Sequence, residues 1–511
     1  ALAQKFGIEA VTRPQAEAAG LSFSKGKGFD AVLICADSKS DDPIQLAGLL
    51  ARDRGIVVAV GAVGLNIQRK MYYEKELDLR ISRSYGPGRY DTSYEEKGVD
   101  YPYGYVRWTE NRNIEAFVDL VAAGKIDPAQ LVTHRYPIEQ AAEAYELITG
   151  KNHTPFLGIL ITYDQEKPVD LVSRVQVYTP PTPINSSLKL GVLGAGNYAG
   201  AVFLPSIKKV GGVQAQSIVS ASGLTARQAA QKFGFLYAGS SEEEVLADPD
   251  INVIALLTRH QHHARQVMTA LKNGKAVYCE KPLAIKNEEL QEIQVLLQDQ
   301  QLPLLTVGFN RRFAPLSIPL ANFFKNRSEP LVAHYRINAG FLPLNHWTQD
   351  PEQGGGRIIG EGCHFIDYLT FLVGSVPLTV QAVKLPDMGK YHNDNVVLTL
   401  TYPDGSIGSI HYLANGDKSV PKEYLEVFCG GKVAVLKDFR SLELTANGQR
   451  TVHQLRFSQD KGHKNAWSAF VNALQNNGTP PIPYEQLFGV TAASFAAEES
   501  LATQETIKIK A

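Results

Sequence analysis

A glycine-rich turn near the middle of the chain constrains the fold more than any other feature. The run GVLGAGNYAG begins with apolar residues typical of a parallel strand, and Gly194, Gly196 and Ala199 follow at the spacing G-x-G-x-x-A. A larger side chain at these positions would block the turn, the approach of a pyrophosphate or the packing of the helix on the strand. Asn197 and Tyr198 lie where backbone N–H groups open a helix N-terminus. The run therefore predicts the strand, turn and helix of a dinucleotide-binding fold.

A second run, VYCEKPLA, places charged residues directly after a short apolar strand. Lys281 precedes Pro282, and a residue before proline is held in extended backbone. Ligands of open parallel sheets bind beyond the carboxyl ends of the strands. We therefore expect the ammonium group of Lys281 to point into that crevice. A dinucleotide such as NAD can take a hydride from an alcohol, and this reaction needs a group that takes the hydroxyl proton. Lys281 is the first candidate for that group.

A third stretch, GGGRIIGEGCHFIDYL at 354–369, follows three glycines with a helical pattern. Glu361, His364 and Asp367 are spaced three residues apart and can share one face of that helix. We expect His364 and Glu361 to face the site of Lys281. The three side chains do not predict a metal site, because no second histidine is placed to complete one.

The order of apolar runs predicts an α/β fold. Over 188–310, strands covered on both faces alternate with helices, which indicates a doubly wound parallel Rossmann sheet. Over 311–511, alternating strands joined by DG and GG turns indicate an α+β domain with a large open antiparallel sheet. Residues 1–163 predict a partial Rossmann-like unit that precedes these domains, and the Pro- and Ser-rich residues 164–187 predict a linker.

Composition excludes several classes of partner. The 511 residues include 51 basic and 52 acidic side chains and no basic run, so we expect no nucleic acid partner. The longest nearly apolar stretch, 55–65, is too short to cross a membrane. The four cysteines form no C-x-x-C pair, which favours a reducing, cytoplasmic compartment. We expect a small-molecule ligand, and the exposed face of the antiparallel sheet makes a homo-oligomer possible.

These motifs carry a resemblance to a known family. The glycine-rich turn, TRHQHHA at 258–264, CEKPLA, VGFNRRFAP at 307–315 and the helix with His364 follow one another as in the Gfo/Idh/MocA oxidoreductases. Residues 188–511 are similar to that family. The resemblance implies an enzyme that transfers hydride between NAD or NADP and the CH–OH group, or the ketone, of a sugar, cyclitol or nucleotide sugar.

The resemblance also implies roles for single residues. Lys281 and His364 would form the pair on the substrate side. The C-terminal open sheet would provide oligomer contacts. The predicted cofactor-binding residues are Gly194, Gly196, Asn197, Tyr198, Ser220, Ser222, Thr258, His260, His263, Glu280 and Asn310.

Two positions depart from the family pattern. Many members have an aspartate four residues before the helix histidine, where this chain has Gly360. Either Glu361 takes its place or the proton passes through Lys281 alone. At the end of the second strand, Ser220 and Ser222 stand where an acidic residue usually binds the ribose of NAD. Arg227 further along could bind a 2′-phosphate through its N–H groups, so both NAD and NADP remain possible cofactors.

Residues 1–163 resemble a different family, the C-terminal half of a medium-chain zinc-type alcohol dehydrogenase. The KELDLRIS strand and the segment LVTHRYPIEQAAEAY carry this resemblance. That family's own glycine-rich loop and zinc ligands do not occur in this sequence, so none of its functional residues is carried over. The fusion of two such regions resembles two-domain bacterial oxidoreductases.

The sequence leaves two other functions open. One is a glycosidase that oxidises its sugar transiently with bound NAD and then restores it, as some relatives in the Gfo/Idh/MocA family do. The other is a non-catalytic regulator that binds a dinucleotide. Gly360 in place of the aspartate favours the regulator, whereas Lys281 and His364 favour an enzyme.

Overall fold

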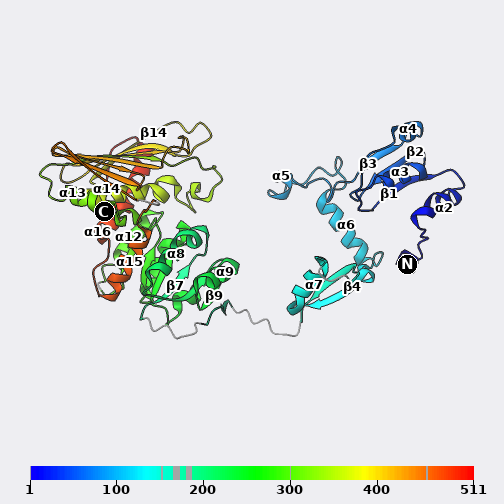
Figure 1. Cartoon of the computed structure of the whole chain (residues 1–511), viewed down its shortest axis with the longest axis horizontal. Helices are drawn as coiled ribbons and strands as arrows, with labels where there is room; N and C mark the ends of the chain where they lie inside the picture. Colours follow the sequence, from blue (N-terminus) through cyan, green and yellow to red (C-terminus); the bar gives the residue numbers. More distant parts are fainter. Residues whose placement is uncertain are drawn as a thin grey trace. The chain divides into compact units, whose positions relative to one another are not determined.

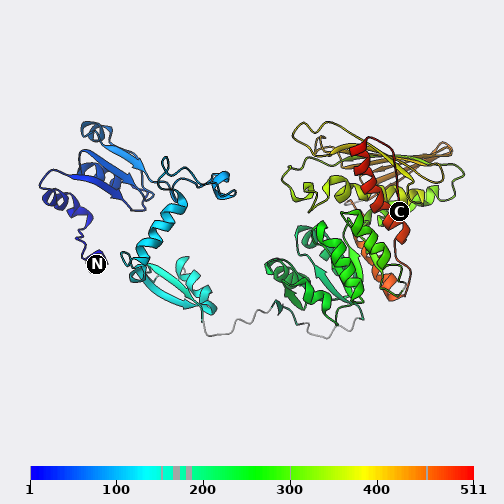
Figure 2. The ribbon, with the colours of Figure 1, turned by 180° about the vertical axis from the view of Figure 1, so that it is seen from behind.

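The structure is a computed structural model of the chain, shown in Figure 1 and from behind in Figure 2. It divides into two compact units, Ala1–Val169 and Asp170–Ala511. The residues that the structure describes are 2–150, 154–164, 173–179, 187–299, 301–455 and 459–510.

The first unit is built on a three-stranded parallel sheet with the order β1-β2-β3. A small core forms where Ile44 of α3 packs near Val57 of β2 and Tyr72 of α4. A separate parallel pair, β4 and β5, completes the unit. Its elements are α1 (Leu2–Lys5), α2 (Ala16–Phe23), β1 (Phe29–Ile34), α3 (Asp42–Leu50), β2 (Ala51–Ala59), α4 (Arg69–Glu74), β3 (Asp78–Ile81), α5 (Thr92–Glu95), α6 (Glu110–Ala122), β4 (Val132–Pro137), α7 (Ala141–Ile148) and β5 (Gly158–Thr162).

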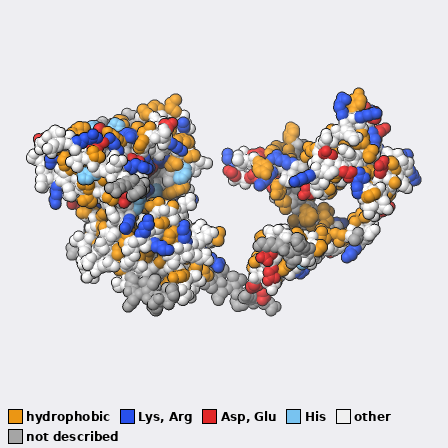
Figure 3. Space-filling view, in the orientation of Figure 1, with side chains coloured by type: hydrophobic (Ala, Val, Ile, Leu, Met, Phe, Trp, Pro, Cys, Tyr) orange, Lys and Arg blue, Asp and Glu red, His pale blue; other side chains and the backbone are white. Residues whose placement is uncertain are grey.

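Much of the apolar surface of the first unit stays in contact with solvent. Figure 3 shows hydrophobic side chains over much of its visible face, and Phe23, Tyr73 and Tyr105 are among those exposed. The parallel sheet is the structure predicted for a partial Rossmann-like unit.

The second unit contains a seven-stranded sheet with the order β12-β11-β10-β7-β8-β9-β6. From β7 in the centre, the chain runs outward through β8 and β9, then returns to β10 and continues to β12 on the other side. The strands from β7 to β12 are parallel. This order confirms the predicted doubly wound Rossmann sheet. Its elements are β7 (Lys189–Leu193), α8 (Leu204–Val210), β8 (Gln214–Val219), α9 (Leu224–Phe233), β9 (Tyr237–Gly239), α10 (Glu242–Ala247), β10 (Val253–Leu256), α11 (His263–Lys272), β11 (Ala276–Cys279), α12 (Asn287–Leu296) and β12 (Leu305–Val307).

One strand of this sheet comes from the predicted linker 164–187. β6 (Arg174–Gln176) pairs antiparallel with β9 and forms the edge of the sheet. The guanidinium group of Arg174 also bonds to Asp248. Part of the segment predicted as a linker therefore belongs to the folded domain, although its composition gave no strand pattern. Residues 165–172 and 180–186 of it lie outside the described residues.

The C-terminal region forms a nine-stranded sheet with the order β20-β19-β18-β17-β13-β16-β15-β14-β21. Its neighbours are antiparallel except β13 and β16, which are parallel. Buried and exposed residues alternate along β13, so one face packs inward and the other is open. This confirms the predicted open sheet. The strands are β13 (Val332–Asn338), β14 (Thr379–Lys384), β15 (Asn395–Thr401), β16 (Ile407–Leu413), β17 (Glu423–Cys429), β18 (Lys432–Lys437), β19 (Ser441–Ala446), β20 (Gln449–Gln454) and β21 (Ile507–Lys508).

Helices join the two domains of the second unit. α16 packs against β14 and α14 as well as against α12 of the Rossmann domain. One hydrophobic cluster continues from the Rossmann strands into the inner face of the large sheet. The helices of this region are α13 (Ser317–Phe324), α14 (Cys363–Val373), α15 (His463–Gln475) and α16 (Tyr484–Thr503). In the described part of the chain, no helix is long and apolar enough to cross a lipid bilayer.

Helix α15 follows the large sheet in sequence but packs in the Rossmann domain, against α8. Trp467 is fully buried there, with its ring 5.4 Å from the rings of Phe203 and of Tyr278. The predicted division at residue 310 therefore does not separate the two cores, because α15 completes the first one.

Replacing Trp467 tests this packing. Trp467→Ala should lower the free energy of unfolding of the second unit by about 3–5 kcal/mol, the usual cost of removing a large buried aromatic side chain. Trp467→Phe should cost much less, because the indole N–H has no hydrogen-bond partner among the described residues. Urea unfolding measures both variants, with Leu224→Ala on the exposed face of α9 as the control. Equal stability of Trp467→Ala and the control would contradict this role of α15.

Candidate functional site

A large cavity of the second unit lies beyond the carboxyl ends of the Rossmann strands. It has a volume of about 1050 Å³ and is bounded by the turn after β7, the end of β8 and the loops after β10 and β11. Because β7 lies between β8 and β10, this is the switch point where an open parallel sheet binds ligands. All eleven predicted cofactor-binding residues line it: Gly194, Gly196, Asn197, Tyr198, Ser220, Ser222, Thr258, His260, His263, Glu280 and Asn310.

The glycine-rich turn leaves room for a dinucleotide. Gly194 has φ +101°, and a Cβ atom there would lie 2.6 Å from the carbonyl oxygen of Leu257. A Cβ atom on Gly196 would meet nothing within 4 Å, so the backbone there is open to the cavity. A single π-helical turn, Ala199–Phe203, then leads into α8. The first glycine is thus required by the turn and the second keeps the approach to the backbone free, which fits a bound pyrophosphate.

Tyr198 and Glu280 close one end of this cavity. The hydroxyl of Tyr198 donates to Oε1 of Glu280 at 2.7 Å. Burial raises the pKa of Glu280, and the bond from Tyr198 only partly opposes that shift. Gly308 faces this carboxyl, because a Cβ atom there would lie 2.7 Å from Glu280 Oε1. The side-chain amide of Asn310 donates to the carbonyl of Lys461 at 2.7 Å and so fixes the segment before α15.

Two histidines fix the loop after β10. Nδ1 of His263 lies 2.7 Å from the carbonyl oxygen of Pro282, and Nδ1 of His260 lies 2.7 Å from that of Gly354. Burial lowers the pKa of His263 to about 4 and that of His260 to about 2, so both are neutral near pH 7. The ring of Trp347 packs edge-on against His260 at 4.8 Å. These histidines hold the loop in place through hydrogen bonds.

A smaller cavity of about 280 Å³ opens beside the large one. The two cavities share six lining residues: His260, Lys281, Asn310, Trp347, His364 and His463. A molecule in the small cavity would therefore meet one end of a dinucleotide in the large cavity. Lys281 and His364 both lie at this junction.

Lys281 is held by the π-helical turn Ile358–Gly362, which leads into α14. Its Nζ donates to the carbonyl oxygen of Gly360 at 2.8 Å. The imidazole of His364 is buried, and its Nδ1 has no hydrogen-bond partner within the described chain. Burial, with Arg311 and Lys281 nearby, lowers the pKa of His364 well below its ordinary value. A neutral imidazole with an unpaired nitrogen thus lies near Nζ of Lys281, an arrangement that can orient a hydroxyl and move its proton.

Gly360 packs closely against the loop after β10. A Cβ atom at Gly360 would lie 3.0 Å from Cε1 of His260 and 3.1 Å from the carbonyl oxygen of Gly354. A larger residue at this position would require these neighbours to shift by a few tenths of an ångström.

Glu361 occupies a cluster of its own on the wall of the small cavity. Its Oε2 accepts from Arg357 at 2.9 Å and from the hydroxyl of Tyr412 at 2.5 Å, and its Oε1 lies 2.5 Å from Nζ of Lys422. Burial works to raise its pKa, but Lys422 and Arg357 outweigh burial and lower it. No hydrogen bond among the described residues joins Glu361 to Lys281 or His364. The expectation that Glu361 replaces the missing aspartate in proton transfer therefore finds no support in the geometry.

Sequence reasoning missed several residues of the small cavity. Lys422, Lys461 and His463 line it. Lys422 precedes β17, Lys461 precedes α15 and His463 begins α15, all far from the other motifs in sequence. Spacing alone gave no sign of their convergence. Arg311 of the VGFNRRFAP motif also lines the cavity, whereas Arg312 of that motif pairs with Asp367 in the core, so Asp367 is structural.

The described residues contain no group of three His, Cys, Asp or Glu side chains that could hold a metal ion.

The large cavity also contains two carboxylates that the sequence did not predict, beside its serine residues. Glu242 and Glu243 of α10 line it together with Ser220, Ser222 and Ser240. The sequence pattern gave no reason to place these carboxylates there, because they follow β9, a strand it did not predict. Arg227 is exposed and does not line this cavity.

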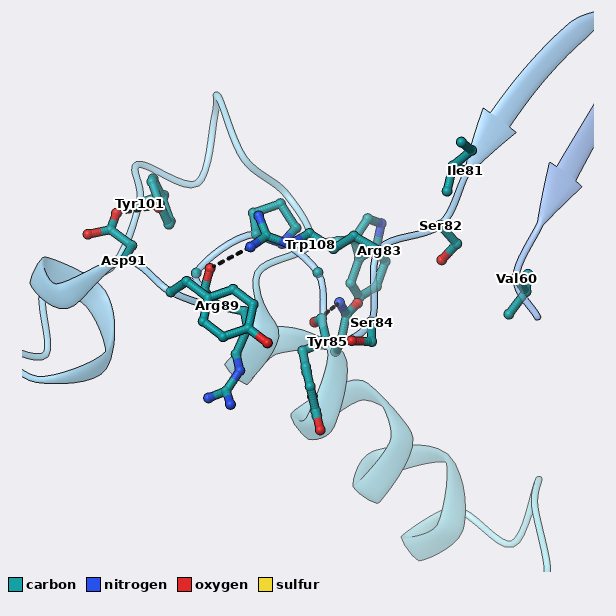
Figure 4. A pocket seen from close by; sticks show the side chains of 15 residues that line it. Val60, Ile81, Ser82, Arg83, Ser84, Tyr85, Arg89, Asp91, Tyr101 and Trp108 are labelled. Atoms are coloured by element: carbon teal, nitrogen blue, oxygen red, sulfur yellow. Dashed lines mark hydrogen bonds between the residues drawn. The ribbon is translucent and has the colours of Figure 1, made fainter. Parts of the chain in front are cut away.

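The first unit has a cavity of about 1020 Å³, shown in Figure 4. It lies beyond Val60 and Ile81, at the carboxyl ends of β2 and β3. The guanidinium group of Arg89 lies 4.7 Å from the ring centre of Tyr90, and Arg83 lies 5.2 Å from the same ring. This cavity has no glycine-rich turn of the G-x-G-x-x-A type, so we place the dinucleotide site in the second unit.

Comparison with known proteins agrees with this assignment. Residues 188–309 match the family model described as oxidoreductase family, NAD-binding Rossmann fold. Residues 328–486 match its companion, oxidoreductase family, C-terminal alpha/beta domain. Both models describe Gfo/Idh/MocA proteins. The prediction of an oxidoreductase with a nicotinamide-binding Rossmann domain is confirmed, whereas the resemblance of residues 1–163 to alcohol dehydrogenases stays a prediction.

Individual relatives cover the same part of the chain. The 1,5-anhydro-D-fructose reductase of Ensifer adhaerens is 26% identical over 332 residues, 63% of this chain and 98% of that protein. The trans-1,2-dihydrobenzene-1,2-diol dehydrogenase of Mus musculus is 28% identical over 44% of this chain and 67% of its own. A solved levoglucosan dehydrogenase, in complex with NADH and levoglucosan, superposes with a TM-score of 0.56 at 21% identity, over 63% of this chain and all of that one.

The two family matches span both domains that form the cavities. Within residues 188–486, the chain belongs to the Gfo/Idh/MocA family of oxidoreductases.

Proposed function

We propose that this chain is an NAD-dependent oxidoreductase that acts on the CH–OH group, or the ketone, of a sugar-like substrate. One observation carries the proposal: Lys281 and His364 lie where the small cavity meets the cleft for the dinucleotide. A small polar molecule there would have its reacting carbon beside one end of the cofactor. The names of the relatives that act on anhydrofructose and levoglucosan support a sugar or cyclitol as substrate.

The residues of the chain divide the work as follows. The glycine-rich turn and Asn310 would hold the dinucleotide, which supplies the hydride acceptor or donor when it is bound. During oxidation, Nζ of Lys281 acts as a free amine and takes the hydroxyl proton, and during reduction the resulting ammonium group returns that proton. The neutral imidazole of His364 binds the same hydroxyl and orients it. Glu361 stays ionised and fixes Arg357 and Lys422 on the wall.

We propose NAD rather than NADP as the preferred cofactor. Glu243 lies at the serine-rich end of the cleft, and its pKa is lowered by bonds from its own backbone and from Ser241, so it is ionised near pH 7. A carboxylate can accept bonds from ribose hydroxyls but repels a 2′-phosphate. Arg227, the candidate for a phosphate contact, does not line the cleft.

A homo-oligomer is also proposed, through the open face of the large sheet. Val332 faces Ile407 on one neighbouring strand and Phe428 on the other, and all three side chains are exposed. Such a row of apolar side chains on a sheet is typical of an interface.

The resemblance of the first unit to alcohol dehydrogenases is a further proposal, supported by its parallel β1-β2-β3 sheet.

The role of Lys281 is tested by its replacement. Lys281→Ala should lower kcat by about 10²–10⁴-fold, the usual contribution of a positioned acid or base. Binding of NADH, followed by its fluorescence, should change little, because Lys281 lies at the substrate side of the cleft. Lys286→Ala, which removes an exposed ion pair with Glu352, is the matched control. Equal turnover in Lys281→Ala and Lys286→Ala would refute the assignment.

Cofactor preference gives a second test. The ratio of kcat/KM for NAD to that for NADP should exceed about tenfold, which corresponds to about 1.4 kcal/mol. Glu243→Gln should reduce this ratio several-fold by removing the repulsion of the 2′-phosphate. The exposed Glu288→Gln on α12 should leave it unchanged. A preference for NADP in the unaltered chain would overturn the assignment.

A further inference from the structure

The wall of the small cavity is strongly cationic. Besides Lys281, which moves the hydroxyl proton, four of its lining residues are basic, namely Arg311, Arg357, Lys422 and Lys461, whereas Glu361 is the one carboxylate among the lining residues that the structure describes. The three histidines that share the wall are held neutral by burial, which lowers the pKa of each. A neutral sugar would need few of these cations.

The cations are held in place by two carboxylates. Glu361 binds Arg357 and Lys422. Behind the wall, Glu423 accepts two bonds from Arg311, at 2.8 and 2.9 Å, and lies 2.5 Å from Nζ of Lys461. Each carboxylate therefore serves two cations. Each cluster has one positive charge more than its carboxylate can balance.

Neighbouring carboxylates do not cancel this excess within the cavity. Glu280 lines the large cleft and is hydrogen-bonded by Tyr198. Asp394 lies 4.0 Å from the guanidinium group of Arg357, and burial raises its pKa. Asp460 accepts from the backbone N–H of Gly462. None of the three lines the small cavity, so the groups closest to a bound substrate remain mostly positive.

Two of the lysines retain donors for a ligand. An ammonium group has three N–H donors. In the described chain, Nζ of Lys422 donates to Glu361 and Nζ of Lys461 donates to Glu423. Both lysines line the small cavity while they keep these bonds, so a ligand there can meet their remaining donors. Positive charge held out of water in this way is costly unless an anion joins it.

On this basis we infer that the substrate carries an oxyanion, a carboxylate or a phosphate ester, which Lys422 and Lys461 bind while its hydroxyl carbon lies at Lys281. The inference rests on the proposed function and narrows it to acidic sugars. Charge-assisted bonds from lysine to such groups are short and strong. A cavity of about 280 Å³ lies just below the roughly 300–1,000 Å³ of most ligand pockets, so it suits a single sugar ring.

Matched substrates test the inference. The NAD-loaded protein is offered a hexose, the hexuronate with the same ring and the hexose 6-phosphate. The nucleoside diphosphate conjugates of the hexose and of the hexuronate are offered as well. Reduction of NAD is followed by absorbance. One of the anionic forms should exceed the neutral hexose in kcat/KM by about tenfold or more, and the comparison of carboxylate, monoester and diphosphate conjugate shows which oxyanion is recognised.

Lys422→Gln provides the second arm. It should raise KM for the preferred anionic substrate by about tenfold or more and change KM for the neutral hexose by less than about threefold. Lys418→Gln, an exposed lysine of the same loop, is the control. Fluorescence of bound NADH shows whether each variant keeps its fold.

The outcomes separate this inference from the proposed function. If the neutral hexose is oxidised as well as its acidic counterparts, or if Lys422→Gln affects both equally while NADH binding is intact, the oxyanion inference is wrong and the oxidoreductase assignment stands. If NAD binds but no substrate of either kind reduces it, the proposed function fails and the inference fails with it.

Discussion

The buried pairing of Arg311 with Glu423 is the interaction on which the site depends. Arg311 follows the last Rossmann strand, Glu423 begins β17 of the large sheet, and Lys461, which shares the carboxylate, precedes α15. One carboxylate therefore joins the two domains and the helix that returns to the first. Removing one partner of a buried pair leaves the other charge without a partner, which lowers the free energy of unfolding by about 3–5 kcal/mol. The elements around both cavities are thus positioned together.

The proposed chemistry takes place where the two cavities meet. Lys281 reaches across this junction to the carbonyl of Gly360, and His364 lies one turn further along the same helix. A Cβ atom at Gly360 would crowd the ring of His260, and Glu361 is turned to the cationic wall. We therefore propose Lys281 with His364 for proton transfer, and Glu361 as the residue that holds the cations of the wall.

Local motifs predicted eleven residues that line one cleft, since the glycine-rich turn and the residues that end parallel strands are placed by the strands themselves, but they gave no sign of Glu242 and Glu243. The remaining features depend on tertiary contacts. β6 has three residues in a proline-rich segment, and α15 packs with strands that precede it by about 200 residues, so neither shows in a local pattern. Glu361 has the helical spacing of a catalytic residue, but its partners Tyr412 and Lys422 come from elsewhere in the chain. Spacing gives the face of a helix, whereas the function of that face depends on what packs against it.

We propose that hydride passes between a sugar carbon and the nicotinamide where the two cavities meet. The most direct test uses sugars deuterated at the reacting carbon, incubated with the whole chain and NAD, followed by mass spectrometry of the nicotinamide. We expect deuterium on the reduced nicotinamide, in amounts equal to the oxidised sugar. Unlabelled nicotinamide across acidic and neutral sugars, with NAD demonstrably bound, would rule out hydride transfer from these sugars.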